Sequence, residues 1–284
     1  MEFRTIVDVA DPGFKIGPCE ELLFVGSCFA DQIGRRFGEE RFRTKVNPYG
    51  VMYNPASILH TIERLAAEDY APSVAFLTLG TNHVYRLKAT GEIVDNCQKR
   101  PQHLFQEEEL SVDGCAGYLS QAIALLGRMN PAMHVVLTVS PIRYRKYGYH
   151  GSQLSKATLL LAVNQVTGSH SQPAMHSKPI YFPAYEIVND ELRDYRFYQE
   201  DMLHPSSQAV EYIWQRLSEV YLSDEAKAFL KEWAPLKAAL GHRPFDATSE
   251  EYKAFMDKTM LKVAALQKKY PNFALDVKQQ ALKS

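Results

Sequence analysis

The chain has 284 residues, of which 46% are hydrophobic and 23% charged, and its 32 basic and 33 acidic residues give a formal net charge of −1. This balance gives no general attraction to nucleic acid or to a membrane surface. The first residues do not show the basic segment and apolar core of a signal peptide. No uncharged apolar stretch reaches the roughly 18 residues of a membrane helix. The four cysteines form no CxxC pair. We therefore expect a soluble, cytoplasmic protein with reduced thiols and no membrane span.

The first half of the chain alternates between strand and helix patterns. Residues 22–26 predict a buried strand, followed by a helix in which Phe29, Ile33 and Phe37 recur every four positions. A second strand is expected at 74–80. Residues 83–97 predict a β-hairpin that turns near Thr90 and Gly91, and the acidic run 107–113 predicts a solvated helix start.

The alternation continues through residue 221. Helices are expected at 120–129, 154–166 and 205–221, with a strand at 134–141 and a less regular strand at 179–188. Short apolar strands separated by helices are typical of a mostly parallel sheet that is covered on both faces. The sequence thus predicts a three-layer α/β/α domain over residues 1–222.

Residues 223–284 have a different character. They are charged and helical, with breaks at Gly241, Pro244 and Pro271. A serine-capped helix near residue 250 could bury an apolar stripe made of Tyr252, Phe255, Leu261 and Leu266. We interpret this segment as a helical appendage packed on the α/β domain, and an arm for homo-oligomerisation is the alternative.

Two nucleophile candidates, Ser27 and Cys28, stand where the first strand passes into its helix. In open α/β sheets, ligands bind at the carboxyl ends of the strands. A helix start also offers unpaired N–H groups and the positive end of a dipole, which stabilise a developing oxyanion or a thiolate. Read singly, each residue favours a structural role, Ser27 as a helix cap and Cys28 as core. Their combination with an Asp-x-x-His-Pro motif later in the same alternating chain favours the catalytic interpretation.

A base for such a nucleophile is expected at His204. It follows Asp201 by three residues and directly precedes Pro205, which suits the start of a helix. This spacing can place the carboxylate beside the imidazole, where it fixes the tautomer and stabilises the imidazolium. For the oxyanion hole the candidates are Asn82, just after a strand, and the flexible backbone at Gly50, with Asn96 as the alternative to Asn82.

Residues 140–156 mix basic and aromatic side chains. A chain that is nearly neutral and has no nucleic-acid motif makes RNA binding a poor interpretation. We expect a loop over the site whose side chains hold an anionic or polyhydroxylated substrate, and His83 is expected to line the same cleft. The substrate-binding candidates are Arg143, His150 and Lys156. The nine histidines lack paired-ligand spacing, and neither a P-loop nor a dinucleotide turn is present, so no catalytic metal and no cofactor are expected.

The blocks GSCFA (26–30), NPYGVMYNP (47–55), TVSPIRY (138–144), QLSKATLLLA (153–162) and the long block ending in DMLHPS (201–206) together resemble the GSCFA family. Their order also resembles that of the SGNH (GDSL-type) hydrolase superfamily. The resemblance implies a flavodoxin-like fold and ester or acyl-group chemistry. GDSL enzymes read Gly-Asp-Ser where this chain reads Gly26-Ser27-Cys28, so Cys28 occupies the nucleophile's place and is favoured over Ser27.

The sequence therefore predicts an esterase or acyltransferase that acts on a small acyl ester, with Cys28 or Ser27 as nucleophile and the pair Asp201 and His204 as the base. An acylated sugar, a lipid and a thioester are all compatible as substrates. One alternative is a non-catalytic carbohydrate- or lipid-binding protein of the same fold. Another is a thiol sensor that uses Cys28 and Cys97.

Overall fold

The structure is a computed structural model of the chain, and it describes residues 3–95, 97, 100–168 and 175–273. Its centre is a five-stranded sheet in the order β2 (Arg43–Val46), β1 (Glu21–Gly26), β3 (Val74–Leu79), β7 (His134–Val139) and β8 (Ile180–Tyr181). All neighbouring strands are parallel. Counted along the chain, the order within this sheet is 2-1-3-4-5, which is the flavodoxin-like order. The predicted fold class is confirmed.

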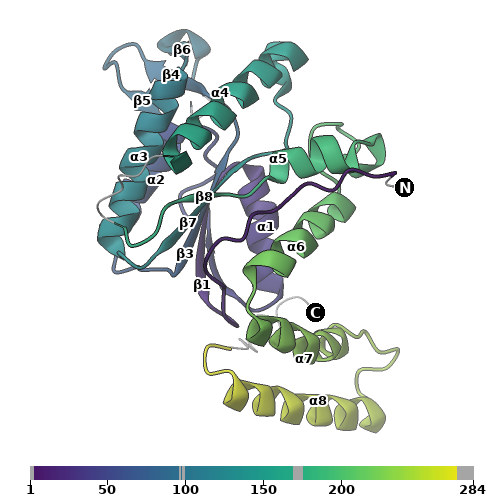
Figure 1. Cartoon of the computed structure of the whole chain (residues 1–284). Coiled ribbons are helices and arrows are strands. Elements are labelled where there is room, and N and C mark those ends of the chain that lie inside the picture. Colours follow the sequence, from purple (N-terminus) through teal and green to yellow (C-terminus); the bar gives the residue numbers. More distant parts are fainter. Residues whose placement is uncertain (1–2, 96, 98–99, 169–174, 274–284) are drawn as a thin grey trace.

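Helices cover both faces of the sheet (Figure 1). One face carries α2 (Pro55–Leu65), α3 (Val112–Met129) and α4 (Gly148–Gly168), which pack on Leu23, Val25 and Leu77. The other carries α1 (Cys28–Glu39) and α6 (Ser207–Tyr221), which pack on Leu22, Phe24 and Phe76. Successive side chains of a strand point to opposite faces, so the unbroken apolar run of β1 serves both cores.

Capping side chains fix where most of the helices begin. In α1, α2, α3, α6, α7 (Asp224–Leu240) and α8 (Glu250–Lys269), the residue before the helix accepts a hydrogen bond from an N–H of the first turn. These caps are Ser27, Asn54, Ser111, Ser206, Ser223 and Ser249. The Ser and Asn residues that punctuate the sequence therefore set the boundaries of its helices.

The predicted hairpin is part of a second, three-stranded antiparallel sheet. Its order is β5 (Ile93–Val94), β4 (His83–Leu87) and β6 (Phe105–Glu109), and the N–H groups of Thr90 and Gly91 close the turn on the Leu87 carbonyl. The expected helix start at 107–113 is wrong for its acidic part. Those residues form β6, where Glu107 pairs with Lys146 and Glu108 with Arg86, and α3 begins only after Ser111.

The less regular strand expected at 179–188 is confined to β8. Pro183 then starts a helical segment made of α5 (Ala184–Glu186) and a π-helix at Ile187–Leu192. Proline fits the start of a helix because it has no N–H to leave unpaired. Short 3-10 helices complete the connections at Gln102–Leu104, Arg145–Tyr147 and Tyr195–Phe197.

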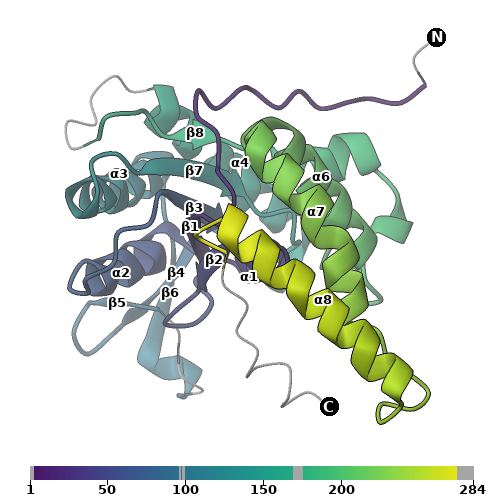
Figure 2. The same cartoon turned by 90° about the horizontal axis from the view of Figure 1, so that it is seen from below.

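The C-terminal helices α7 and α8 pack on each other below the sheet (Figures 1 and 2). Their shared core contains Phe229, Trp233 and Val263, and Cys19 joins it from the α/β part. The expected stripe on α8 is wrong in part, because Phe255 and Leu261 are exposed while Thr259, Val263 and Leu266 face inward. A helix covered by a single neighbour buries only a narrow stripe. Among the described residues, no helix combines the length and the apolar character needed to cross a membrane.

Candidate active site

A cavity of about 290 Å³ opens at the carboxyl edge of the parallel sheet. Four connections line it. Ser27 and Cys28 follow β1, Gly80 and Thr81 follow β3, and residues 140–146 follow β7. The fourth is the segment before α6, with Leu203 and His204, and Tyr53 completes the wall. The topology thus gathers residues that are far apart in the sequence, as expected for the ligand site of an open α/β sheet.

The turn from β1 into α1 is held by close backbone contacts. Gly26 has a φ of +141°, and a Cβ there would lie 2.0 Å from the Thr78 carbonyl oxygen, so only glycine fits. The Gly26 N–H donates to Asn47 Oδ1 at 2.8 Å, and the Ser27 N–H donates to the Thr78 carbonyl at 3.1 Å. Asn47 also donates from Nδ2 to Asp31 of α1 at 2.7 Å. Asn47, which the sequence analysis missed, therefore links strand and helix across the turn.

Ser27 and Cys28 have different surroundings. Ser27 is 2% exposed, and its Oγ accepts the Phe29 N–H at 3.3 Å and lies 3.4 Å from Thr78 Oγ1. Cys28 is the first residue of α1, is partly exposed, and has its Sγ 3.8 Å from the Tyr53 hydroxyl. The hydroxyl of Ser27 is therefore engaged in capping, whereas the thiol of Cys28 borders the cavity.

Tyr53 is a second residue that the sequence analysis missed. Burial, and next the neighbouring Cys28, raise the pKa of the Tyr53 phenol to about 12. The side chain is thus a neutral hydrogen-bond donor at neutral pH. Its signal in the sequence is the aromatic residue of the NPYGVMYNP block that directly precedes the Asn54 cap.

His204 and Asp201 form a tight pair at the cavity. His204 Nδ1 lies 2.5 Å from Asp201 Oδ2, while Asp201 Oδ1 accepts the N–H groups of His204 at 3.0 Å and Leu203 at 2.9 Å. These backbone bonds, and then the imidazole, hold the pKa of the Asp201 carboxyl at about 2. The carboxylate is therefore ionised at neutral pH and fixes the orientation of the ring. Nε2 is the ring nitrogen that Asp201 does not engage.

Of the three residues expected in an oxyanion hole, Gly50 and Asn82 do not line this cavity. The Gly50 N–H donates to the Asn47 carbonyl at 2.9 Å, inside its own turn. The Asn82 side chain is buried and donates to the Leu110 carbonyl at 2.8 Å. Asn96 lies outside the described residues. Donors that could serve instead are the Tyr53 hydroxyl, which borders the cavity, and the N–H of Cys28, which as a first-turn group has no partner within its helix.

Of the four residues expected to bind substrate, Arg143 lines the cavity and His83, His150 and Lys156 do not. Arg143 lines the cavity, and its N–H donates to the Leu203 carbonyl at 3.1 Å, which ties it to the segment of His204. His83 is buried and stacks on Tyr147, with ring centroids 3.5 Å apart. His150 is exposed on α4 and is not among the cavity-lining residues.

Lys156 lies behind the cavity rather than on its wall. It is 2% exposed, and its Nζ donates to the carbonyls of Gly80 and Ser140, both at 2.7 Å. Burial lowers the pKa of the Lys156 amine to about 7. Because Gly80 and Ser140 both line the cavity, Lys156 connects the ends of β3 and β7 where they form its wall.

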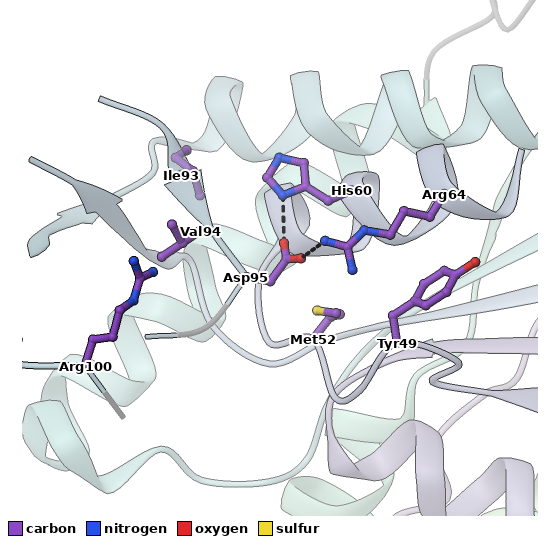
Figure 3. A pocket seen from close by; sticks show the side chains of 8 residues that line it. All are labelled: Tyr49, Met52, His60, Arg64, Ile93, Val94, Asp95 and Arg100. Atoms are coloured by element: carbon purple, nitrogen blue, oxygen red, sulfur yellow. Dashed lines mark hydrogen bonds and ion pairs between the residues drawn. The ribbon is translucent and has the colours of Figure 1, made fainter. Parts of the chain in front are cut away.

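A second cavity, of about 340 Å³, contains another His–Asp pair (Figure 3). His60 Nδ1 lies 2.7 Å from Asp95 Oδ1, and Arg64 donates to Asp95 Oδ2 at 2.8 Å. The pair joins α2 to the end of β5. No Ser, Thr or Cys is among the described residues that line this cavity.

The described residues contain no group of three His, Cys, Asp or Glu side chains placed to hold a metal ion. All four cysteines are free, with Cys19 and Cys115 buried and Cys28 and Cys97 partly buried. The chemistry available at the first cavity is therefore that of a thiol, an imidazole–carboxylate pair and hydrogen-bond donors.

Two family models match the sequence. The model described as the GSCFA family matches residues 21–74 and 70–217, and the model described as the C-terminal domain of GSCFA domain proteins matches residues 233–284. Comparison with curated proteins gives no match.

Several solved structures resemble the chain at low identity. A crystal structure of an acetyl esterase mutant with acetate ion is 10% identical, with a TM-score of 0.44 over 75% of this chain and 99% of that one. A carbohydrate esterase family 3 protein from Talaromyces cellulolyticus is 10% identical, with a TM-score of 0.42 over 75% and 99%. A putative platelet activating factor from Streptococcus pneumonia is 16% identical, with a TM-score of 0.46 over 72% and 84%. At these scores the likeness carries no conclusion about function.

Proposed function

The chain belongs to the GSCFA family, and from the chemistry of its cavity we propose that it is an acyl-ester hydrolase with Cys28 as its nucleophile. One observation carries the proposal. The Cys28 thiol and the His204 imidazole line the same cavity, and Nδ1 of that imidazole is hydrogen-bonded to the ionised carboxylate of Asp201. A nucleophile, a base and a group that orients the base are the three components of covalent acyl transfer.

In the proposed first step, His204 Nε2 takes the proton from Sγ of Cys28 while the sulfur attacks the ester carbonyl carbon. Asp201 keeps the proton of the imidazole on Nδ1 and stabilises the imidazolium. The tetrahedral oxyanion accepts hydrogen bonds from the Cys28 N–H and from the Tyr53 hydroxyl, which is neutral because of its raised pKa. Collapse breaks the carbon–oxygen bond, and the leaving alkoxide takes the proton from His204.

The second step repeats the first with water. His204 deprotonates the water, whose oxygen attacks the carbonyl carbon of the thioester, and the carboxylic acid leaves as the sulfur recovers its proton. An alcohol in place of water would make the same intermediate transfer its acyl group. Both reactions use the same residues, so the choice between hydrolase and acyltransferase depends on the acceptor that enters the cavity.

The contacts of Ser27 support its role as a cap. For its hydroxyl to attack, the Oγ would have to release the Phe29 N–H and leave its place beside Thr78. Losing such a cap typically costs about 1 kcal/mol of stability. The thiol of Cys28 needs no such rearrangement, since within the described part of the chain its side-chain hydrogen bond is to the Tyr53 hydroxyl.

An acylation experiment tests the proposal. The chain is incubated with p-nitrophenyl acetate, quenched in acid and digested, and the acetylated residue is located by mass spectrometry. We expect an acetyl group on Cys28 in the wild type and in Ser27→Ala, and none at this site in Cys28→Ala or His204→Ala. Labelling that is equal in the wild type and His204→Ala would contradict the role of the base. Tight binding of an ester without an adduct would favour the binding-protein alternative, and a reversible Cys28–Cys97 disulfide that forms equally in His204→Ala would favour the thiol sensor.

A further inference from the structure

We propose that the substrate carries an anionic group, a carboxylate or a phosphate, on the alcohol side of its ester, and that Arg143 binds this group. The proposed site of binding lies between the reaction cavity and a further cavity of about 210 Å³. Arg143 lines both cavities. The inference rests on the proposed function for the position of the ester carbonyl, and it commits to an anionic rather than a polyhydroxylated substrate.

Arg143 is held in place but keeps its hydrogen-bonding groups free. Its guanidinium carbon lies 4.2 Å from the centre of the Tyr198 ring, a stacking contact that leaves the N–H groups available in the plane. Its backbone N–H bonds to the Leu203 carbonyl, next to His204. Among the described residues, no carboxylate forms an ion pair with Arg143. A partly buried guanidinium without an acid is a ready partner for an incoming anion.

The charges around the reaction cavity favour the same ligand. Its described lining contains Arg143, Arg145 and Lys146 but no Asp or Glu. Lys146 is paired with Glu107, whereas Arg145, like Arg143, has no ion pair within the described part of the chain. The lining also lacks Asn and Gln, which together with carboxylates usually bind the hydroxyl groups of a sugar. The described lining therefore carries cations and hydroxyl groups but no carboxylate.

The neighbouring cavity supplies a second cation. Arg193 lines it together with Arg143, Asn189 and Asp194. Two of its other polar side chains are already engaged, because the Asp194 carboxylate accepts from Arg196 and Asn189 Nδ2 donates to the Tyr185 carbonyl at 2.7 Å. The acyl group would thus lie beside Cys28 and the anionic group would point past Arg143 toward Arg193.

Binding to matched ligand pairs tests the inference without turnover. The full-length Cys28→Ala protein is titrated by calorimetry with 4-acetoxybenzoate and with its uncharged counterpart 4-acetoxybenzamide. A second pair, glycerol monoacetate phosphate and glycerol monoacetate, replaces the carboxylate by a phosphate. We expect the charged member of at least one pair to bind about tenfold more tightly, which is the size of one charge-assisted hydrogen bond. The pair that discriminates more strongly identifies the anion.

Variants locate the effect. In the Cys28→Ala background, Arg143→Gln should remove most of the difference between charged and neutral ligand, and Arg143→Lys should restore part of it. Arg128 is an exposed residue of α3 that lines neither cavity. Arg128→Gln therefore controls for the loss of one positive charge and should leave the difference intact. Raising the salt concentration should reduce the difference.

The outcomes are separable. Equal affinity within both pairs would overturn the anionic substrate even if the wild type hydrolyses the neutral esters. An affinity difference that survives Arg143→Gln would overturn the role of Arg143. Conversely, a clear preference for the anion combined with no acylation of the wild type would support this inference and contradict the proposed hydrolase.

Discussion

Two His–Asp pairs with similar Nδ1–Oδ distances occur in different settings within the described part of the molecule. His204 and Asp201 are 2.5 Å apart at the carboxyl edge of the sheet, and His60 and Asp95 are 2.7 Å apart between α2 and β5 (Figure 3). The carboxylate oxygen that does not contact the histidine differs between the pairs. Asp201 Oδ1 accepts hydrogen bonds from two backbone N–H groups, whereas Asp95 Oδ2 accepts one from the Arg64 side chain. The cavity of His204 also contains a thiol, and the described lining of the other contains no comparable nucleophile.

The comparison shows that a His–Asp pair does not by itself indicate catalysis. An imidazole oriented by a carboxylate becomes a general base only where a proton donor of the reaction can reach its other nitrogen. At His60 the pair ties a helix to the inserted sheet and serves the fold. The His60 cavity is therefore an internal control for the His204 cavity.

The largest difference is expected between His204→Ala and His60→Ala. With an ester substrate, His204→Ala should lower kcat/KM by about 10³-fold, because general-base catalysis contributes roughly 10²–10⁴-fold. His60→Ala should remain within about twofold of the wild type. Steady-state kinetics on p-nitrophenyl acetate measures both, and circular dichroism checks the fold. A comparable loss in the two variants would mean that the two pairs do not differ as proposed.

A basic residue lies near each cavity, with Lys156 bonded to the wall of the His204 cavity and Arg64 bonded to Asp95. The pKa of buried Lys156 is about 7, below the roughly 10.4 of an unfolded lysine, so between these values the unfolded chain binds more protons. The wild type should therefore gain stability relative to Lys156→Met as pH rises from about 7 to about 10, by up to ~1.4 kcal/mol per pH unit. Arg64 is half-exposed, and Arg64→Met should show no such slope. Urea unfolding at pH 7, 8.5 and 10 measures the free energy of unfolding of each variant. The prediction is refuted if this free energy depends on pH in the same way in the wild type and in Lys156→Met.

A smaller effect is expected at the tyrosines of the two cavities. Tyr53→Phe removes a neutral donor beside Cys28 and should lower kcat by about 10- to 100-fold, somewhat less than the loss of a full oxyanion-hole donor. Tyr49 lines the His60 cavity and donates to Glu68, so Tyr49→Phe should leave kcat unchanged. An unchanged kcat in Tyr53→Phe would remove this hydroxyl from the mechanism.

The smallest effect concerns stability at His60. Its bond to Asp95 raises the pKa of the His60 imidazole. A raised pKa contributes stability that is fully present below about 6.5, the value of an unfolded histidine, and is lost as pH rises through the folded value. His60→Gln should therefore cost more stability at pH 5.5 than at pH 8.5, by less than about 1 kcal/mol for this partly exposed pair. Thermal unfolding at the two pH values measures the difference, and a larger cost at pH 8.5 would reverse the assignment.

Several features of the fold could be predicted because they depend on local patterns. The strand runs at 22–26, 74–80 and 134–141 coincide with β1, β3 and β7, since a strand buried on both faces must be apolar throughout. The acidic strand β6 could not be predicted in this way. Its glutamates are stabilised by Arg86 and Lys146 from other elements, which override a pattern that resembles a helix start.

The candidate site divides along the same line. Asp201 and His204 are three residues apart, and the helix start at Cys28 follows from its serine cap, so both could be recognised in the sequence. Asn47 and Tyr53 could not, because they act through contacts with Gly26 and Cys28 that span more than 20 residues. Asn82 has the expected spacing after β3, yet its side chain donates to the Leu110 carbonyl because the pairing of β4 with β6 places Leu110 opposite it.

By itself, the sequence determined the alternation of buried strands and capped helices, and hence the layered α/β fold, because apolar periodicity and capping act over a few residues. It also determined the local pairing of Asp201 with His204. Only the tertiary structure decided which polar side chains face the cavity without a competing partner among the described residues, as Cys28 and Arg143 do, and which groups are engaged in hydrogen bonds of the fold, as those of Ser27, Gly50 and Lys156 are. The physical reason is that each backbone or side-chain group has few hydrogen bonds to give, and the fold assigns them between segments that the sequence order keeps apart.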